Sequence, residues 1–484
     1  MTHMVVHGLD WSYMMDKELE KRVDEYVDEV WDNVLDDIAT LVAVPSVAIE
    51  GANEPGAPFG KDSRAALDCA LGIAAKLGYQ TSDDEGYMGM ADIPGESERQ
   101  IATIAHVDVV PAGPGWNTDP FTMVRRDGWL LGRGVIDDKG PAVLGLYAGA
   151  FLLREGVTPR YTFRALLGCD EETGMKDVPH YLSTHEDPAF LFTPDAEFPV
   201  CNAEKGQFGA TFTSGVITDG KILSWSGAEA TNAVPSQSIC EVAVDASELP
   251  APVANADRLT IEPVGDGRAR ITAQGIGGHA SMPEGTLNAI ALVLGYLKET
   301  GICKGDEAQA LELLSIIHAD TTGSALGIAA SNDAFGPLTL NGGTIEVKEG
   351  RILQTIDVRL PNCVNLTELE DTCRAVAERF GATLNVDHAV EAFYIPADSP
   401  AVKTLIDTYN DVTGENATPF SMGGGTYARK FKSAVSFGAE THGLVLPEWA
   451  GLMHGPNEAA SEAQLKQALK IYILAIFRLM ELDL

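Results

Sequence analysis

Histidine and carboxylate side chains stand together directly after an apolar run of the sequence. His106 and Asp108 follow the run 101–105, which has the composition of a buried strand. On an extended backbone, side chains two residues apart point to the same side. Asp108 can therefore accept a hydrogen bond from one imidazole nitrogen of His106 while the other nitrogen binds a metal ion. This spacing is also common at ordinary surfaces, so the pair alone does not establish a site.

Further acids and one more histidine occur in loops after other apolar runs. Clustered acids are costly to bury unless cations neutralise them, although acids that precede a helix can also serve only as caps. Carboxylate and imidazole suit Zn, Mn and Co, and one carboxylate can bridge two ions. Together the loops predict a two-metal hydrolytic site. The motifs are AHVD with His106 and Asp108, GRGVIDDKGP with Asp137, GCDEETG with Glu171 and Glu172, TPDAEFP with Asp195, and MHGPNE with His454.

The elements that must hold these loops alternate between helices and strands. An apolar stripe predicts an amphipathic helix over 19–41, and short apolar runs then alternate with helical patterns. This alternation is typical of a mainly parallel sheet that is covered by helices on both faces. The sequence therefore predicts an α/β fold.

A change in the pattern of predicted strands and helices divides the chain into domains. After about Gly206, strand pairs and helices indicate α+β units, and the earlier alternation returns near residue 395. We therefore expect one discontinuous domain, residues 1–208 and 393–484, and an inserted α+β domain, residues 209–392. The length of 484 residues is enough for about two to four domains.

Charge and cysteine usage restrict the partners and the compartment. The chain has 34 basic and 70 acidic residues, and the net charge of −36 repels phosphate backbones and anionic lipids. Seven scattered cysteines without a C-x-x-C pair favour a reducing compartment, and we recognise neither an export signal nor an apolar run that could span a bilayer. We therefore expect a cytoplasmic protein with no nucleic acid or membrane partner. The histidines without a motif partner, which we assign to surface or core, are His3, His7, His180, His185, His318, His388 and His442.

The quoted motifs have a family resemblance. Together with GGHASMPEGTLNA at 277–289, they resemble in order and spacing the metallopeptidase family of aminoacylases, succinyl-diaminopimelate desuccinylases and di-zinc carboxypeptidases. The resemblance is strongest to the bacterial dipeptidase V (PepV) branch, and it covers nearly the whole chain. It implies that the discontinuous domain is catalytic and that the inserted domain is a two-lobed lid.

The resemblance also implies a set of metal ligands. Asp137 would bridge two divalent ions, with His106 and Asp195 on one ion and Glu172 and His454 on the other. Zinc is the first choice, with Mn or Co as alternatives, because these ligands suit all three.

Two more acids receive roles from the resemblance. Asp108 would orient His106, and Glu171 would be the general base that activates a metal-bridging water and returns the proton to the leaving amine. The family also has a cis peptide bond at the position of Asp137 and Asp138, and we expect one here.

The inserted domain supplies the substrate residues that the resemblance implies. His279 would donate a hydrogen bond to the oxyanion of the tetrahedral intermediate, and Asn232 lies in a loop like the family's asparagine loop. Arg359 would bind the C-terminal carboxylate of the substrate through its planar guanidinium. A glycine loop with Gly424 and Gly425 would let the backbone approach the substrate.

These implications predict a metal-dependent dipeptidase that hydrolyses short peptides with free N- and C-termini. A two-lobed lid would replace a partner subunit, so we expect a monomer whose partner is a small peptide substrate. An N-acyl-amino-acid deacylase with the same two-metal mechanism is the alternative. A non-catalytic peptide-binding protein is a remote alternative, because the ligand and base positions are all filled.

Overall fold

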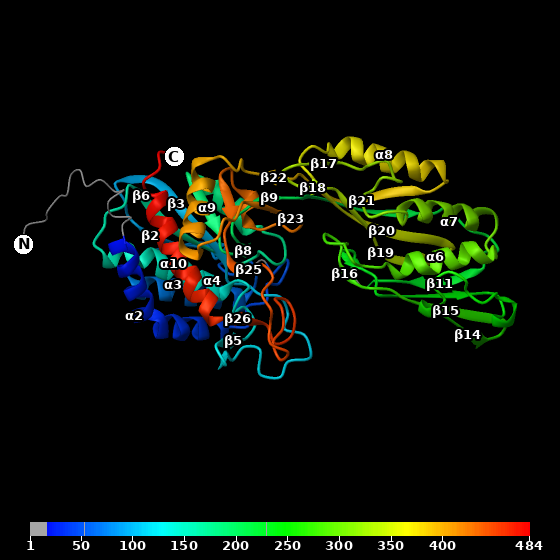
Figure 1. The fold of residues 1–484 in the computed structure, drawn as a ribbon, viewed down its shortest axis with the longest axis horizontal. Coiled ribbons are helices and arrows are strands. Elements are labelled where there is room, and N and C mark those ends of the chain that lie inside the picture. Colours follow the sequence, from blue (N-terminus) through cyan, green and yellow to red (C-terminus); the bar gives the residue numbers. More distant parts are fainter. Residues whose placement is uncertain (1–16, 53, 229) are drawn as a thin grey trace, which may run out of the picture. The chain divides into compact units, whose positions relative to one another are not determined.

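The chain folds into two compact units (Figure 1). The computed structural model describes residues 17–484 except 53 and 229, so His3 and His7 lie outside the described residues. The second unit consists of Ala203–Tyr394 and Ser421–Gly424, and the rest of the described chain forms the first unit. The domain boundaries that the sequence suggests, after residues 208 and 392, stay a prediction. The short return of the chain to the second unit at Ser421–Gly424 is not foreseen from the sequence.

The largest sheet has nine strands in the order β1-β2-β6-β3-β7-β24-β9-β22, with β23 paired to β9. Its centre, β6-β3-β7-β24, is parallel, whereas the outer pairs on both sides are antiparallel. The α/β class with a parallel centre is thus confirmed, and the antiparallel edges are an addition. The strands are β1 (Gln80–Asp84), β2 (Met88–Ile93), β3 (Ser97–His106), β6 (Tyr161–Gly168), β7 (Phe190–Thr193), β9 (Cys201–Glu204), β22 (Phe393–Tyr394), β23 (Phe420–Met422) and β24 (Ala434–Ser436).

Parallel strands bring the acidic loops to one edge of this sheet. Strand β3 ends at His106, β6 ends at Gly168 and β7 ends at Thr193. Because the carboxyl ends of parallel strands meet at the same edge, the loops that follow them lie together. This arrangement gathers residues that are far apart in the sequence.

The helices of the first unit cover the sheet. Helix α4 is buried along nearly its whole length, because its sequence is apolar on all sides between Pro141 and Leu152. It packs on β3 and β6, and α2 and α10 pack against it in turn, as Figure 1 shows in blue and red. The helices are α2 (Lys17–Val42), α3 (Lys61–Leu77), α4 (Lys139–Arg154), α5 (Asp177–Thr184), α9 (Pro400–Thr413) and α10 (Glu462–Leu479).

The second unit contains two four-stranded antiparallel sheets with helices, as expected for an α+β insertion. One sheet has the order β19-β20-β10-β21 and the other β11-β13-β15-β14. Helix α6 packs on β13 and β15, and α8 packs on β21. The elements are β10 (Gly206–Thr213), β11 (Ile222–Ser226), β13 (Gln237–Val242), β14 (Leu259–Gly265), β15 (Arg268–Gln274), β19 (Thr339–Lys348), β20 (Arg351–Leu360), β21 (Thr383–Val390), α6 (Ala289–Thr300), α7 (Gly305–Ile317) and α8 (Leu366–Arg379).

Short elements complete both units. Among the described residues, no helix is long and apolar enough to cross a membrane. The short elements are β4 (Val124–Arg126), β5 (Trp129–Leu131), β8 (Ala196–Phe198), β12 (Ala233–Val234), β16 (Gly278–His279), β17 (Ser331–Asn332), β18 (Gly336–Pro337), β25 (Ala439–Thr441), β26 (Ala459–Ser461) and the 3₁₀ turns Ala246–Glu248, Ala256–Arg258 and Tyr427–Lys430.

Close packing between α4 and the sheet gives a stability prediction. A Cβ atom added at Gly149 of α4 would overlap the Phe163 ring and the Tyr79 hydroxyl. We expect Gly149→Ala to destabilise the protein by about 1 to 3 kcal/mol, because overpacking outweighs the gain in helix propensity. Thermal and urea unfolding would measure the change.

Gly72 of α3 is the matched control, because nothing lies within 4 Å of an added Cβ there. Gly72→Ala should stabilise the protein by about 0.5 to 1 kcal/mol. Equal effects of the two substitutions would contradict the packing argument.

Candidate metal centre

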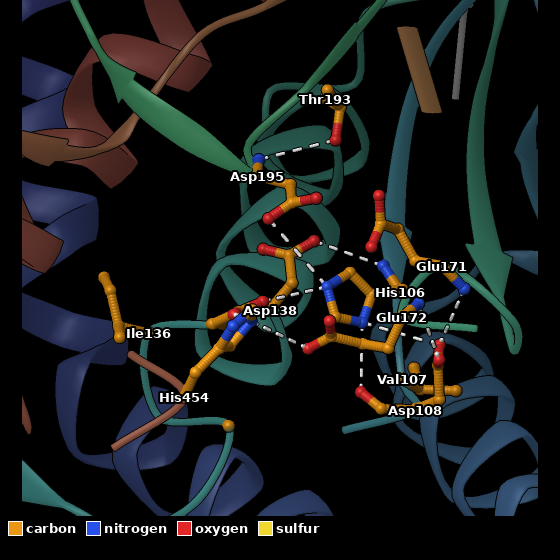
Figure 2. A network of polar contacts seen from close by, with 12 residues as sticks. His106, Val107, Asp108, Ile136, Asp138, Glu171, Glu172, Thr193, Asp195 and His454 are labelled. Carbon is orange, nitrogen blue, oxygen red and sulfur yellow. Dashed lines mark hydrogen bonds and ion pairs between the residues drawn. The ribbon is translucent and has the colours of Figure 1, made fainter. Parts of the chain in front are cut away.

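His106 lies at the centre of the acidic loops, with its ring fully buried (Figure 2). Its Nε2 is 3.0 Å from Asp137 Oδ1 and 3.8 Å from Asp195 Oδ1. On the other side of the ring, Nδ1 is 3.0 Å from the backbone carbonyl oxygen of Asp108. If this contact is an Nδ1–H donor bond, Nε2 is left with a lone pair that faces two carboxylates, as a metal ligand requires.

The carboxylate of Asp108 lies farther from the ring and has a second set of contacts. Its Oδ1 is 3.5 Å from His106 Nδ1, and its two oxygens accept hydrogen bonds from the backbone N–H groups of Glu171 at 3.3 Å and Glu172 at 3.2 Å. Asp108 therefore connects the loop after β3 to the loop after β6. One residue thus fixes His106 through its carbonyl and both glutamates through its side chain.

Asp137 faces two histidines with different oxygen atoms. Its Oδ1 faces His106, and its Oδ2 is 2.7 Å from His454 Nε2. Glu172 Oε1 is 3.2 Å from the same nitrogen of His454. A carboxylate in this position can bridge two ions, each with one histidine.

The donor atoms fit metal ions. His106, Asp137 and Glu172 form one group whose ligand atoms lie within 4.8 Å of one another, and His106, Asp138 and Asp195 form another. Asp138 Oδ1, in the second of these groups, is also buried without a hydrogen bond to any described residue. A buried carboxylate oxygen without a donor is costly, and a divalent cation would remove that cost. The residues present therefore fit the ions that the resemblance implies.

Asp138 is a candidate that the sequence leaves without a role. The Asp137–Asp138 peptide bond is cis, as expected. The Asp138 side chain is buried, and its Oδ2 accepts a hydrogen bond of 3.1 Å from the backbone N–H of His106. Only its position beside Asp137 could have pointed to it in the sequence.

The buried charges explain the acid–base properties of the centre. Hydrogen bonds to Asp137 and Glu172 raise the pKa of His454 to about 10. Burial lowers the pKa of His106, but the carboxylates around it outweigh burial and raise that pKa well above its usual value. Burial and then the charge of Asp195 raise the pKa of Glu171 well above its ordinary range. These shifts reflect an excess of buried negative charge, which positive ions would relieve.

Glu171 and Glu172 differ in direction although they are neighbours. Figure 2 shows the Glu172 carboxylate turned toward His454, whereas the Glu171 carboxylate leaves the backbone along another path. Adjacent residues can therefore take different tasks, one as a ligand and the other as a base.

A buried ion pair joins two of the ligand loops. Arg133 and Glu458 pair with side chains that are 1% and 0% exposed. Glu458 Oε1 accepts hydrogen bonds from the backbone N–H groups of Gly134 at 3.0 Å and Asp137 at 3.4 Å. Arg133 Nη2 donates to the carbonyl oxygen of His454 at 3.2 Å. The pair thus links the loop of Asp137 to the loop of His454, and its residues lie within the GRGVIDDKGP and MHGPNE motifs.

A second buried carboxylate supports the loop that carries Glu171. Asp177 Oδ2 accepts hydrogen bonds from the backbone N–H of Cys169 at 2.8 Å and of Asp170 at 3.2 Å. The same oxygen accepts a hydrogen bond from the Tyr427 hydroxyl. Asp177 and Tyr427 are not found by motif spacing, because their role depends on contacts across the fold.

The substrate candidates His279, Asn232 and Arg359 lie in the second unit. Strands β12 and β16 pair Ala233 with His279, and the Ala280 N–H donates to the Asn232 carbonyl oxygen at 2.8 Å. The fold therefore brings Asn232 and His279 together. Arg359 is buried, and its charge contributes to lowering the pKa of His279 after burial itself.

Arg359 is held by protein groups on several of its nitrogens. Its Nε and Nη2 donate to the two oxygens of Asp357 at 2.7 and 3.0 Å, and its Nη1 donates to the Gly423 carbonyl oxygen at 2.8 Å. In the glycine loop, a Cβ at Gly425 would meet the Arg429 guanidinium, and one at Gly424 would lie 3.1 Å from Met422 Cε. Packing within the protein therefore accounts for small residues at these positions.

Histidines and carboxylates gathered at the edge of a parallel sheet are typical of hydrolases with a metal centre. The family model of "Peptidase family M20/M25/M40" matches residues 102–478. The chain therefore belongs to this peptidase family and is a hydrolase that acts on peptide bonds.

Curated relatives agree with this assignment, and a solved structure has a similar fold. The chain is 30% identical over 447 residues to "Putative dipeptidase YtjP" of Bacillus subtilis, which covers 90% of this chain and 94% of the relative. It is 30% identical over 441 residues to "Beta-Ala-Xaa dipeptidase" of Lactobacillus delbrueckii subsp. lactis, with 87% and 90% covered. The fold resembles that of human carnosine dipeptidase 1, with a TM-score of 0.58, 14% identity, and 96% and 99% of the chains covered.

The buried ion pair between Arg133 and Glu458 gives the second prediction. We expect Arg133→Met to destabilise the protein by about 3 to 5 kcal/mol in urea unfolding, because Glu458 is left buried without its cation. The double variant with Glu458→Gln should recover part of that loss. The control is Lys21→Met, since Lys21 and Glu25 are 66% and 62% exposed. Its effect should stay within about 0.5 kcal/mol, and a similarly small effect at Arg133 would refute the linking role.

Proposed function

We propose that the chain is a metal-dependent dipeptidase that hydrolyses short peptides with free N- and C-termini. The observation that carries the proposal is that His106 and His454 face different oxygens of Asp137, with Glu172 beside one of them. The names of the curated relatives, which are dipeptidases, support the same reaction. The catalytic part is the discontinuous domain of residues 1–208 and 393–484, and residues 209–392 form the lid of a monomer.

In this proposal Asp137 would hold both ions. His106 and Asp195 complete one site, and Glu172 and His454 complete the other. Two divalent ions, zinc first and Mn or Co as alternatives, supply a water activated for attack and a polarised carbonyl when they are bound.

The proton transfers belong to Glu171. Its carboxylate takes a proton from the attacking water and later gives that proton to the nitrogen of the leaving amine. Asp108 keeps Glu171 in place, because its Oδ1 accepts the backbone N–H of that residue at 3.3 Å. The same side chain holds Glu172, so base and ligand share one support.

The second unit binds the substrate in this proposal. His279 donates a hydrogen bond to the developing oxyanion, with Asn232 directly before the strand that pairs with His279. Arg359 pairs with the C-terminal carboxylate of the peptide, in an orientation that Asp357 fixes through two hydrogen bonds. The loop with Gly424 and Gly425 contacts the peptide backbone.

Glu440 favours a free amine over an acyl group at the N-terminal side of the substrate. Strand β8 begins directly after Asp195 and runs parallel to β25. The two strands pair Glu197 with Glu440. Burial, and then the charge of Glu197, raises the pKa of Glu440 to about 7. Among the described residues, no cation pairs with Glu440, whereas Glu197 pairs with His442 at 2.8 Å. A substrate ammonium would supply the missing positive charge, and an N-acyl group would not.

The reaction is tested by a matched panel of substrates. Free dipeptides, N-acetyl amino acids and N-succinyl amino acids are incubated with chelated enzyme, with and without added Zn, Mn or Co, and the products are measured by mass spectrometry. We expect metal-dependent cleavage of the dipeptides alone. Cleavage of only the acylated compounds would assign the chain to the deacylases instead.

Glu171→Gln is the control for this panel, because it removes the base and keeps the ligands. We expect it to bind the metal ions, measured by elemental analysis, while turnover falls by a factor of at least about 100. Metal binding without turnover in the wild-type chain would support the peptide-binding alternative.

Substitution of Glu440 tests the selection of a free amine. We expect Glu440→Gln to raise KM for free dipeptides at least about tenfold, the cost of one charged hydrogen bond, and to leave the inhibition constant of an N-acetyl dipeptide unchanged. Glu197→Gln is the control and should have a smaller effect, since His442 already faces that carboxylate. An equal rise of KM for the free dipeptide and of the inhibition constant for the N-acetyl dipeptide would refute the role of Glu440.

A further inference from the structure

Ser281 makes two contacts with the ring of His279. The backbone N–H of Ser281 donates to Nδ1 at 3.1 Å, and the Ser281 hydroxyl oxygen lies 2.7 Å from the same nitrogen. A backbone N–H can only donate, so Nδ1 must be an acceptor and carries no proton. The ring proton of neutral His279 therefore resides on Nε2.

The other ring nitrogen is open for a ligand. The part of the chain that the structure describes offers no hydrogen bond to Nε2 of His279, and the side chain is exposed. Strand pairing between Ala233 and His279 fixes the backbone of the histidine, and the Ala280 N–H bond to Asn232 fixes the next residue. The ring thus presents one donor, Nε2–H, from a backbone that is held on both sides.

Close packing against Gly423 restricts the position of Ser281. A Cβ atom at Gly423 would overlap the Cβ of Ser281, so only glycine fits there without a shift. The Gly423 carbonyl accepts a hydrogen bond from Arg359, which Asp357 holds in turn. A continuous series of contacts within the second unit therefore supports the ring contact of Ser281.

We propose that Ser281 is a positioning residue that keeps His279 as the neutral tautomer with its proton on Nε2. This inference rests on the proposed function only in assigning that donor to the oxyanion. The donor is then in place before the substrate arrives, and His279 neither takes nor gives a proton during the reaction. Partial desolvation of the ring and then the charge of Arg359 lower the pKa of His279, which supports the neutral ring.

The tautomer is measured directly by NMR on the full chain with ¹⁵N-labelled histidine, and the His279→Gln variant assigns the resonances. We expect the Nδ1 resonance of His279 in the range of an unprotonated ring nitrogen and Nε2 in the range of a protonated one. The opposite assignment would overturn the proposal. This readout needs no activity, so it decides the inference even if dipeptides are not hydrolysed and the proposed function fails.

Two substitutions of similar size test the part of Ser281. Asn at position 281 can donate to Nδ1 through its amide, whereas Asp offers only acceptors. We expect Ser281→Asn to keep the proton on Nε2, and Ser281→Asp to move it to Nδ1 or to add a second proton. Dipeptide turnover should fall about a hundredfold in the Asp variant, which is the cost of one lost oxyanion donor, and much less in the Asn variant.

Ser281→Ala covers the case in which the Asp variant fails to fold, because it removes the hydroxyl without adding a charge. We expect a smaller population of the Nε2–H tautomer and a three- to tenfold lower kcat, about the effect of one hydrogen bond, with little change in KM. Unchanged ring resonances in both the Ala and the Asp variants would overturn the role of Ser281.

Discussion

Negative charge concentrated at one edge of the central sheet is the constraint on which the first unit depends. Asp137, Glu172 and Asp195 come from three different loops, and burial removes most of the water that would otherwise solvate them. Two histidines offset part of this charge, and their pKa values rise accordingly. The remaining excess makes the centre a place for cations, because divalent ions neutralise what the protein leaves uncompensated.

Buried carboxylates that accept backbone N–H groups and a buried ion pair hold the charged loops together. Asp108 and Asp177 accept hydrogen bonds from backbone N–H groups of the loop after β6. These hydrogen bonds orient the backbone that carries the two glutamates. The buried pair of Arg133 and Glu458 does the same for the loops of Asp137 and His454. Buried ion pairs contribute little net stability, but they fix geometry where breaking one partner is costly.

The second unit has a different part in the proposed function, in which its candidate residues present hydrogen-bond donors rather than bind cations. Nε2 of His279 is available to a ligand because Ser281 contacts Nδ1. The orientation of the Arg359 guanidinium is fixed by its hydrogen bonds to Asp357. Both side chains are thereby oriented before a ligand is bound. Preorganised donors of this kind lose little entropy on binding and act on charge as it develops.

The sequence by itself determined the α/β class, the helices and strands around the motifs, and the membership in a metallopeptidase family. These follow from apolar periodicity and from short motifs, which are local properties of the chain. Only the tertiary structure decided that the Asp108 carbonyl contacts His106 while its carboxylate binds two amides, that Asp138 joins the acidic group, and that Glu440 pairs with Glu197. Such contacts join residues far apart in the sequence, and the direction of each side chain depends on packing that no local pattern specifies.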